Sequence, residues 1–248
     1  MAGLVYIIGA GPGDPGLLTQ KASDCLRTAD IVVYDRLVSS EILALIPPTC
    51  ERVYAGKAAQ HHTMAQDEIN ALLVEQALRD RTVVRLKGGD PFIFGRGAEE
   101  AEALVKAGIP FEIVPGVSSV LAAPAYAGIP LTHRTLSSGF HVVAGHECLE
   151  SSGTPWDALG RSSYTLVVLM GVGHLKEIAD CLMAHGRAPD TPVAIVRAAT
   201  TPQQEVLEAT LETIAYLASE RRLTPPAVIV VGDVVKLRRT LHWFDTVE

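Results

Sequence analysis

The stretch Gly9-Ala10-Gly11-Pro12-Gly13-Asp14-Pro15-Gly16 decides the fold, because it joins an apolar run at residues 4–8 to a helical pattern at residues 17–29. A strand that passes through a glycine-rich turn into a helix is typical of the first unit of a parallel α/β sheet. Read from Gly11, the stretch has the spacing G-x-G-x-x-G, and Asp35 follows nineteen residues after its last glycine. Dinucleotide-binding loops and their ribose-binding acid have this spacing, so a nicotinamide cofactor is the first hypothesis to test.

The chemistry of this turn departs from that of a phosphate-binding loop. A pyrophosphate is held by backbone N–H groups and by the positive end of a helix. Pro12 and Pro15 have no N–H to offer, and Asp14 places a negative charge where the diphosphate would lie. Asp14 and Pro15 also suit the cap and the first position of a helix, which is the alternative explanation for Asp14. The turn therefore predicts close backbone approach to a ligand that is uncharged or cationic.

Strand-like and helix-like patterns alternate along the chain in two series. In the first series, short runs rich in Val and Ile predict strands at residues 4–8, 30–34, 51–54, 82–86 and 110–114. Helical patterns lie between them, at residues 17–29, 40–46, 65–80 and 98–108. Such alternation predicts an α/β domain with a mainly parallel sheet.

The second series predicts another α/β domain. Its strand-like runs and helical patterns are residues 140–145, 164–170, 191–196, 204–210 and 226–232, and residues 174–186 and 211–218. A segment rich in Gly, Pro, Ser and Thr, residues 128–139, separates the two series. We therefore expect domains at residues 1–134 and 135–248. Ligands of such sheets bind beyond the carboxyl ends of the strands, and a cleft between two domains is a favoured site.

Composition and charge exclude several classes of protein. The chain of 248 residues is 48% hydrophobic and 20% charged, which is typical of a folded protein with a large core. Its formal net charge of −7 argues against nucleic acid as a partner. No apolar run reaches the ~18 residues that a membrane span needs, and no basic segment precedes the first strand, so we expect no membrane partner and a cytoplasmic location. Four distant cysteines without a C-x-x-C pair predict reduced thiols and no metal site: Cys25, Cys50, Cys148 and Cys181.

A second loop, RLKGGDPFIFGRGAEE at residues 85–100, carries more side-chain chemistry. Gly88-Gly89 permits close backbone approach, and Asp90-Pro91 favours a turn. Residues 92–94 are Phe, Ile and Phe, although a solvated loop would carry polar side chains. These features together favour a binding loop over a merely structural one.

Positive charges gather in the same region of this acidic chain. Arg81, Arg85, Lys87 and Arg96 fall within sixteen residues. They form either a local site for anions or a solvated edge, and the sequence alone leaves both explanations open. Arg96 also lies three residues before Glu99 at the start of a helix, so we expect these two side chains to pair.

Six motifs carry a resemblance to a known family: GAGPGDPGLLT at 9–19, IVVYDRLVS at 31–39, VVRLKGGDPFIFGRG at 83–97, VPGVSS at 114–119, AGIPLTHR at 127–134 and LHWF at 241–244. With them the chain resembles the uroporphyrinogen-III C-methyltransferases, which are S-adenosylmethionine (SAM)-dependent tetrapyrrole methylases. The GPGDP start and the GDP loop are shared with precorrin methylases and diphthine synthase, whereas KGGDPFIFGRG and LTHR are typical of this group. The resemblance implies two α/β domains of the tetrapyrrole methylase type, with SAM and the active site in the cleft between them, and a homodimer.

The resemblance also implies a reaction. Uroporphyrinogen III is methylated on two ring carbons, in rings A and B, to give precorrin-2 and S-adenosylhomocysteine. Precorrin-2 leads to sirohaem, cobalamin or haem d₁, and the sequence does not choose among them. The alternatives are another precorrin or diphthine-synthase-like methylase of the same class, a nicotinamide oxidoreductase, and a tetrapyrrole-binding protein without catalysis.

By position in these motifs, the resemblance implies SAM contacts from nine residues: Pro12, Gly88, Gly89, Asp90, Ile93, Ser118, Ser119, Met170 and Ala199. Three features depart from the family pattern. Ser118-Ser119 stands for the commoner Thr-Ala, and Ala98 and Ala199 each stand for Gly. Ser keeps a hydroxyl group, and Ala199 can still offer its backbone groups provided that its φ is negative.

For catalysis, the resemblance implies Asp35 as a proton acceptor and Lys57 as a proton donor. It assigns Arg96, Glu99 and Arg134 to substrate handling near the transferred methyl group. Each assignment has a structural alternative: Asp35 as a helix cap, Lys57 as a solvated loop lysine, and Arg134 in an ion pair at a hinge.

The charge of the implied substrate requires positively charged side chains at the site. Uroporphyrinogen III is rich in carboxylates, so an acidic enzyme must gather its bases at the site, and Arg96, Arg134, Lys57 and Lys87 are the candidates. His61, His62 and His133 suggest a metal, but no Cys or acid lies at ligand spacing, and we expect no metal.

Overall fold

The computed structural model describes residues 3–56, 64–145 and 153–244. The chain divides into two compact units, Met1–Ser119 (unit 1) and Val120–Glu248 (unit 2). The boundary falls earlier than the expected one at 134/135, because α5 (Ser119–Tyr126) belongs with the second sheet. Val120 and Ala123 of this helix are buried against strand residues of unit 2. The glycine- and proline-rich segment that suggested the later boundary therefore lies inside unit 2.

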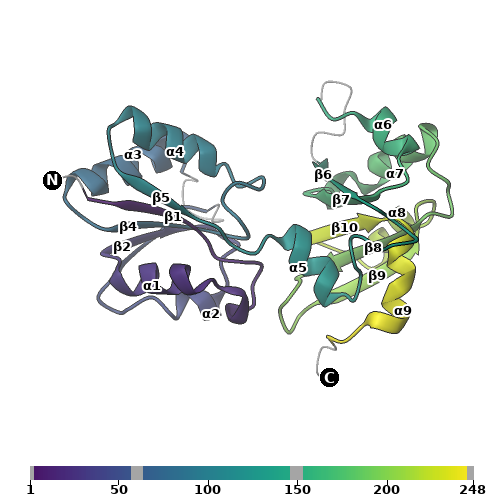
Figure 1. Ribbon diagram of the computed structural model, residues 1–248, viewed down its shortest axis with the longest axis horizontal. Coiled ribbons are helices and arrows are strands. Elements are labelled where there is room, and N and C mark those ends of the chain that lie inside the picture. Colours follow the sequence, from purple (N-terminus) through teal and green to yellow (C-terminus); the bar gives the residue numbers. More distant parts are fainter. Residues whose placement is uncertain (1–2, 57–63, 146–152, 245–248) are drawn as a thin grey trace. The chain divides into compact units, whose positions relative to one another are not determined.

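Unit 1 is a parallel sheet with helices on both faces (Figure 1). Its strands are β1 (Val5–Gly9), β2 (Ile31–Tyr34), β3 (Glu51–Tyr54), β4 (Val83–Lys87) and β5 (Phe111–Val114). The order across the sheet is β3-β2-β4-β1-β5, and every pairing is parallel. The expected mainly parallel α/β domain is thus confirmed, with strand bounds within about one residue of those expected.

The two faces of this sheet follow from the alternation of side chains along each strand. Ile8 packs with α1 (Gln20–Thr28) and α2 (Ser40–Leu43) on one face. Ile7 packs with α3 (Gln66–Leu78) and α4 (Gly97–Lys106) on the other. Because both faces are covered, β1 and β2 read as continuous apolar runs.

Unit 2 is a mixed sheet in the order β6-β7-β10-β8-β9. Its strands are β6 (Phe140–Ala144), β7 (Thr165–Leu169), β8 (Pro192–Arg197), β9 (Glu205–Thr210) and β10 (Ala227–Val231). β6 and β7 are parallel, whereas β10 runs antiparallel to both β7 and β8. β7 and β8 therefore point the same way and end at the same edge of the sheet.

Helices cover both faces of the second sheet as well. α6 (Trp156–Arg161), α7 (Leu175–Ala184) and α8 (Ile214–Glu220) pack on one face. α5 and the 3-10 helix η4 (Asp233–Leu237) pack on the other, and α9 (Arg238–Leu241) follows. Within the described ranges, none of the helices has the length and apolar character that crossing a membrane would require.

Three loops of unit 1 meet through glycine backbones. A Cβ at Gly9, the last residue of β1, would lie 2.5 Å from the Gly89 carbonyl oxygen and 2.6 Å from the Gly116 Cα. Gly11 and Gly89 exchange backbone hydrogen bonds of 3.1 and 2.7 Å, and both have φ in the left-handed region, at 78° and 68°. The loops after β1, β4 and β5 therefore touch at the carboxyl edge of the sheet, where any larger residue would separate them.

The substitution Gly9→Ala tests this contact. We expect it to lower the free energy of unfolding by about 1–3 kcal/mol, because the added methyl group meets backbone atoms that have no room to move. Urea unfolding followed by circular dichroism measures the change. Gly173→Ala is the matched control, since a Cβ there meets nothing within 4 Å. Equal stability of the two variants would show that the glycine contact is not required.

Candidate functional site

The carboxyl edge of unit 1 collects most of the residues that the sequence analysis singled out. All five strands are parallel, so the segments that follow them emerge on one side. β1 lies between β4 and β5. The connection from β1 leads past β4 to β2, whereas the connection from β4 leads past β1 to β5. The connections from these two neighbouring strands therefore run in opposite directions across the sheet. In open α/β sheets, ligands bind at such a switch point.

The glycine-rich turn after β1 is a stiff support for this edge. The Asp14 carboxylate accepts the Gly16 N–H at 2.7 Å, and Pro15 is the first residue of the 3-10 helix η1 (Pro15–Leu17). The cap explanation for Asp14 is therefore confirmed. Ser39 donates a hydrogen bond of 2.9 Å to the Gly13 carbonyl and ties the turn to the segment that follows β2.

Asp90 fastens the loop after β4 to its neighbours. One carboxylate oxygen accepts the Phe92 N–H at 2.9 Å, and the other accepts the Gly116 N–H at 3.1 Å. Each oxygen keeps a further lone pair that a ligand can use. Gly88 abuts the segment after β2, because a Cβ there would lie 2.7 Å from the Cβ of Leu37.

Ser118 and Ser119 lie beside the same loop. A Cβ at Gly89 would be 3.9 Å from the Ser118 Cα and 3.8 Å from the Ser119 nitrogen. The structure therefore brings Gly88, Gly89 and Asp90 together with these serines and with the turn that contains Pro12.

Residues 92–94 form an exposed apolar tip next to this edge. Phe92, Ile93 and Phe94 are 55%, 44% and 48% exposed. Arg96 follows with φ of 58° and pairs with Glu99 through two hydrogen bonds of 2.8 and 2.6 Å, as expected. The Glu99 hydrogen bond raises the pKa of Arg96, and the same bond lowers the pKa of Glu99.

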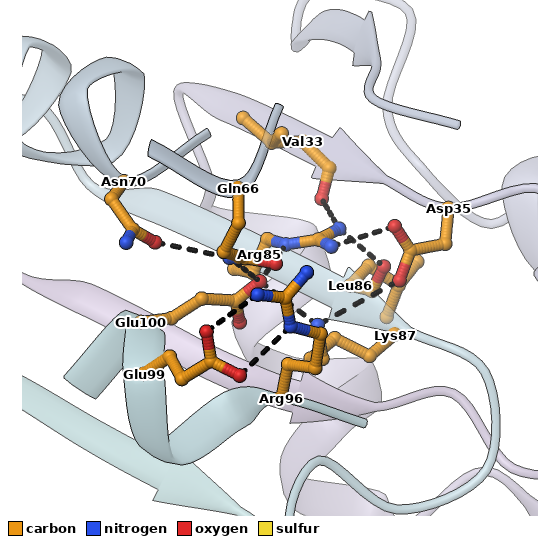
Figure 2. Close-up of polar contacts among 10 residues, drawn as sticks. All are labelled: Val33, Asp35, Gln66, Asn70, Arg85, Leu86, Lys87, Arg96, Glu99 and Glu100. Atoms are coloured by element: carbon orange, nitrogen blue, oxygen red, sulfur yellow. Dashed lines mark hydrogen bonds and ion pairs between the residues drawn. The ribbon is translucent and has the colours of Figure 1, made fainter. Parts of the chain in front are cut away.

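Behind the edge lies a cluster of four charged side chains, Asp35, Arg85, Lys87 and Glu100, which we call the buried charge cluster (Figure 2). Arg85 donates to Asp35 at 2.6 Å and to Glu100 at 2.9 Å. Lys87 donates to the same Glu100 oxygen at 2.9 Å and lies 3.8 Å from Asp35. The side chains of Arg85, Lys87 and Glu100 are 2%, 4% and 0% exposed, whereas that of Asp35 is 29% exposed. Asp35 is thus the member of the cluster that solvent or a ligand reaches.

Burial and charge act in opposite directions on the two cations. Burial by itself lowers the pKa of Arg85, but attraction to Glu100 and Asp35 outweighs it, and the net effect raises that pKa. For Lys87, burial and then repulsion by Arg85 lower the pKa, and the two carboxylates only partly offset them. Arg85 is therefore a fixed positive charge at any working pH.

This cluster corrects two expectations about the basic residues and one about Asp35. Arg85 and Lys87 do not lie on a solvated edge, and Lys87 is too buried and too firmly bonded to Glu100 to bind a substrate carboxylate. Asp35 does not cap α2, because Ser39 accepts the Ile42 N–H in that role.

Sequence reasoning missed Glu100 and the role of Arg85. A signal was present, since Arg85 and Lys87 are two residues apart in a strand that the apolar pattern places inside a parallel sheet. Side chains at this spacing share one face, and charges there must find partners.

In unit 2, Met170 and Ala199 follow β7 and β8 at one edge of the sheet. Met170 is 50% exposed, with φ of 55°. Ala199 lies between Ala198 and Thr200, which both have a positive φ. The φ of Ala199 itself is not positive, as its proposed backbone contact requires. Gln204 holds this turn by accepting the Thr200 N–H at 2.9 Å and donating to the Tyr126 carbonyl at 3.1 Å.

Two further predicted residues are Arg134 and Lys57. Arg134 is exposed in the turn that the His133–Ser137 bridge closes, and it forms no ion pair within the described ranges, so the hinge ion pair is not found there. Lys57 lies outside the described residues, as do His61 and His62. Across the described residues, no group of three His, Cys, Asp or Glu side chains is placed to hold a metal.

Comparison with known proteins places this geometry in context. The sequence profile of the family described as Tetrapyrrole (Corrin/Porphyrin) Methylases matches residues 4–215. A Methanosarcina barkeri protein, named S-adenosyl-L-methionine-dependent uroporphyrinogen III methyltransferase, is 51% identical over 241 residues, which cover 96% of this chain and 94% of that protein. A siroheme synthase from Nitrosospira multiformis is 51% identical over 98% of this chain, but the chain spans only about half, 51%, of its length.

A solved structure agrees with these relatives. It is the uroporphyrin-III C-methyltransferase of Thermus thermophilus, complexed with S-adenyl homocysteine. The TM-score is 0.81 at 46% sequence identity, and the match covers 95% of this chain and 100% of that chain.

Adjacent glutamates on α4 test the buried charge cluster. We expect Glu100→Ala to lower the free energy of unfolding by about 3–5 kcal/mol, because it leaves two buried cations short of a partner. Glu99→Ala removes only a pair whose glutamate is 49% exposed, so its effect on stability is expected to be far smaller. Urea unfolding of both variants measures the difference, and similar losses at the two positions would contradict the buried role of Glu100.

Proposed function

Because the chain belongs to the tetrapyrrole (corrin/porphyrin) methylases, we propose that it is a SAM-dependent uroporphyrinogen-III C-methyltransferase. The proposed reaction places two methyl groups on ring carbons of uroporphyrinogen III, in rings A and B, and gives precorrin-2 and S-adenosylhomocysteine. The observation that carries the proposal is the glycine-lined carboxyl edge of unit 1, where backbones approach closely and prolines remove the donors that a pyrophosphate needs.

The residues of this edge fit SAM better than a dinucleotide. SAM is a sulfonium cation with a ribose and an amino-acid tail and no phosphate, and it supplies an electrophilic methyl group. Gly88 and Gly89 present backbone without a side chain at this edge, and the spare lone pairs of Asp90 suit ribose hydroxyls or an ammonium group. A nicotinamide cofactor would set its diphosphate beside Asp14, which argues against an oxidoreductase.

The remaining SAM contacts are assigned from the family resemblance and stay a proposal. They are Pro12, Ile93, Ser118, Ser119, Met170 and Ala199. The negative φ of Ala199 and the exposure of Met170 are compatible with these assignments.

We assign proton removal to Asp35. After each methyl transfer, a proton must leave the ring system, and a positioned base accelerates such a step by roughly 10²–10⁴-fold. Asp35 is partly exposed at the rim of the site, and Arg85 holds its carboxylate at 2.6 Å. Lys57 is assigned as the proton donor.

Substrate handling falls to three exposed or partly exposed side chains. Arg96, Glu99 and Arg134 are proposed to bind and orient the carboxylate-rich tetrapyrrole, with the arginines as bidentate partners of its carboxylates. The proposal includes a cytoplasmic homodimer, as the family resemblance implies. Whether the precorrin-2 leads to sirohaem, to cobalamin or to haem d₁ is a property of the enzymes that consume it.

Product analysis under anaerobic conditions tests the proposal. The purified protein is mixed with uroporphyrinogen III and methyl-labelled SAM, and the methyl groups on the product are counted by mass spectrometry. Two labelled methyl groups are expected. SAM binding without transfer would reject this substrate in favour of another precorrin or diphthine-type substrate of the class, and NADH binding in place of SAM would reject the methylase.

Asp35→Asn should separate catalysis from cofactor binding. We expect SAM affinity close to wild type by calorimetry and a kcat lower by roughly 10²–10⁴-fold, because the amide keeps the shape but accepts no proton. Wild-type turnover in this variant would remove Asp35 from the mechanism.

Arg134→Ala should affect the tetrapyrrole rather than SAM. We expect KM for uroporphyrinogen III to rise by about tenfold, which corresponds to a lost charge-assisted contact of ~1.4 kcal/mol, with SAM affinity unchanged. Arg239→Ala, another exposed arginine of unit 2, is the control. A loss of SAM affinity with an unchanged KM would refute the assignment.

A further inference from the structure

We propose that Glu100 is a positioning residue for Asp35, acting through the two buried cations that join the carboxylates. The inference deepens the proposed function and rests on it for the role of Asp35 as proton acceptor. Glu100 does not face the solvent and lies behind the reactive edge, so it has no direct contact with substrate in this account.

Among the described residues, the hydrogen bonds of Glu100 all involve one of its two carboxylate oxygens. Its Oε1 atom accepts from Arg85 at 2.9 Å, from Lys87 at 2.9 Å and from Gln66 at 3.3 Å. Its Oε2 atom is buried and has no hydrogen-bond partner among the described residues. A buried carboxylate with an unsatisfied oxygen lowers the stability of the fold. The presence of Glu100 at this position, bonded to two cations, therefore calls for an explanation.

Arg85 is the rigid link between the two carboxylates. Its Nε donates to Glu100 and its Nη2 to Asp35, while its Nη1 lies 3.3 Å from the carbonyl oxygens of Val33 and Leu86. A guanidinium group is planar, so fixing one side fixes the other. Glu100 and the two carbonyls therefore set the direction from which Arg85 meets Asp35.

Lys87 is the second link. Its ammonium group donates a hydrogen bond of 2.9 Å to Glu100 and lies 3.8 Å from Asp35 (Figure 2). Glu100 therefore keeps the positive charge of Lys87 just beyond hydrogen-bond distance of Asp35. Without Glu100, the Lys87 ammonium is free to move onto Asp35 and occupy the oxygen that is to accept a proton.

The charges around Asp35 balance only when all four members are present. From β4, Arg85 and Lys87 face Asp35, and from α4, Glu100 faces both cations. The groups that α3 places in hydrogen-bond contact are neutral, namely Gln66 and Asn70. The exposed Arg96–Glu99 pair interacts electrostatically with Glu100 and Lys87 but adds one charge of each sign. Two positive and two negative charges sum to zero. Removing the charge of Glu100 leaves an excess positive charge beside Asp35, and removing that of Lys87 leaves an excess negative charge.

This charge balance predicts opposite effects of two substitutions on the titration of Asp35. In Glu100→Gln the carboxylate form of Asp35 is favoured, and its titration moves to lower pH. In Lys87→Met the carboxylate form is disfavoured, and the titration moves to higher pH. Removing the opposite charge of Lys87, which lies 3.8 Å from Asp35, shifts such a titration by about one pH unit or more. A cluster that only holds the fold together predicts lower thermal stability in both variants and a pH profile of kcat that does not follow the Asp35 titration.

Carbon NMR on the full chain, labelled with ¹³Cγ-aspartate, measures this directly. The Asp35 resonance is assigned by its loss in Asp35→Asn and followed against pH in wild type, Glu100→Gln and Lys87→Met. Glu102→Gln, an exposed glutamate on the same helix, is the control and should match wild type. Shifts of opposite sign support the inference; unmoved titrations, or shifts of the same sign, overturn it. Should Glu100→Gln fail to fold, an upward shift in Lys87→Met is still required.

The pH profile of kcat supplies a second readout. Its acid limb should move down in Glu100→Gln and up in Lys87→Met, whereas the substrate's own carboxylates titrate alike in every assay. Absence of methyl transfer by the wild type overturns the proposed function, and the NMR titration then still decides the role of Glu100.

Discussion

The contact between the backbones of Gly9, Gly89 and Gly116 is the constraint on which the rest of unit 1 depends. Three loops that follow three parallel strands can touch only where no side chain intervenes. Their contact lets Asp90 bridge two of the loops and lets Gly11 and Gly89 exchange hydrogen bonds. The result is a backbone-lined edge whose three loops are tied to one another.

Electrostatics divide this edge into two parts. The loops themselves present backbone and the carboxylates of Asp14 and Asp90, which suits a cationic methyl donor. The buried charge cluster lies behind them, and the carboxylate of Asp35 is its only partly exposed member. The exposed Arg96–Glu99 pair is different in kind, since solvent screens it and both of its charges are accessible. We propose that an anionic substrate meets positive charge at exposed arginines of this kind.

Much of this arrangement is predictable from the sequence, because it depends on local patterns. The strands and helices of unit 1 follow from their apolar periods, the capping role of Asp14 from turn chemistry, and the Arg96–Glu99 pair from helical spacing. The family resemblance predicted SAM and the site residues. The structure brings Gly88, Gly89 and Asp90 together with the two serines and the turn that contains Pro12, whereas Lys57 lies outside the described residues. The buried charge cluster escaped because its partners meet only in the fold: Arg85 and Lys87 reach a glutamate on the next helix, 15 and 13 residues away. The domain boundary was misjudged for a similar reason, since the packing of α5 rather than local composition decides it.

A crystal structure of the protein with S-adenosylhomocysteine tests the central claim most directly, namely that the glycine-lined edge binds an adenosyl ligand. The account predicts the ligand against the backbone of Gly88 and Gly89, with Asp90 and Pro12 in contact. An adenosyl ligand bound away from these residues, or a nicotinamide dinucleotide bound at the edge in its place, would contradict it.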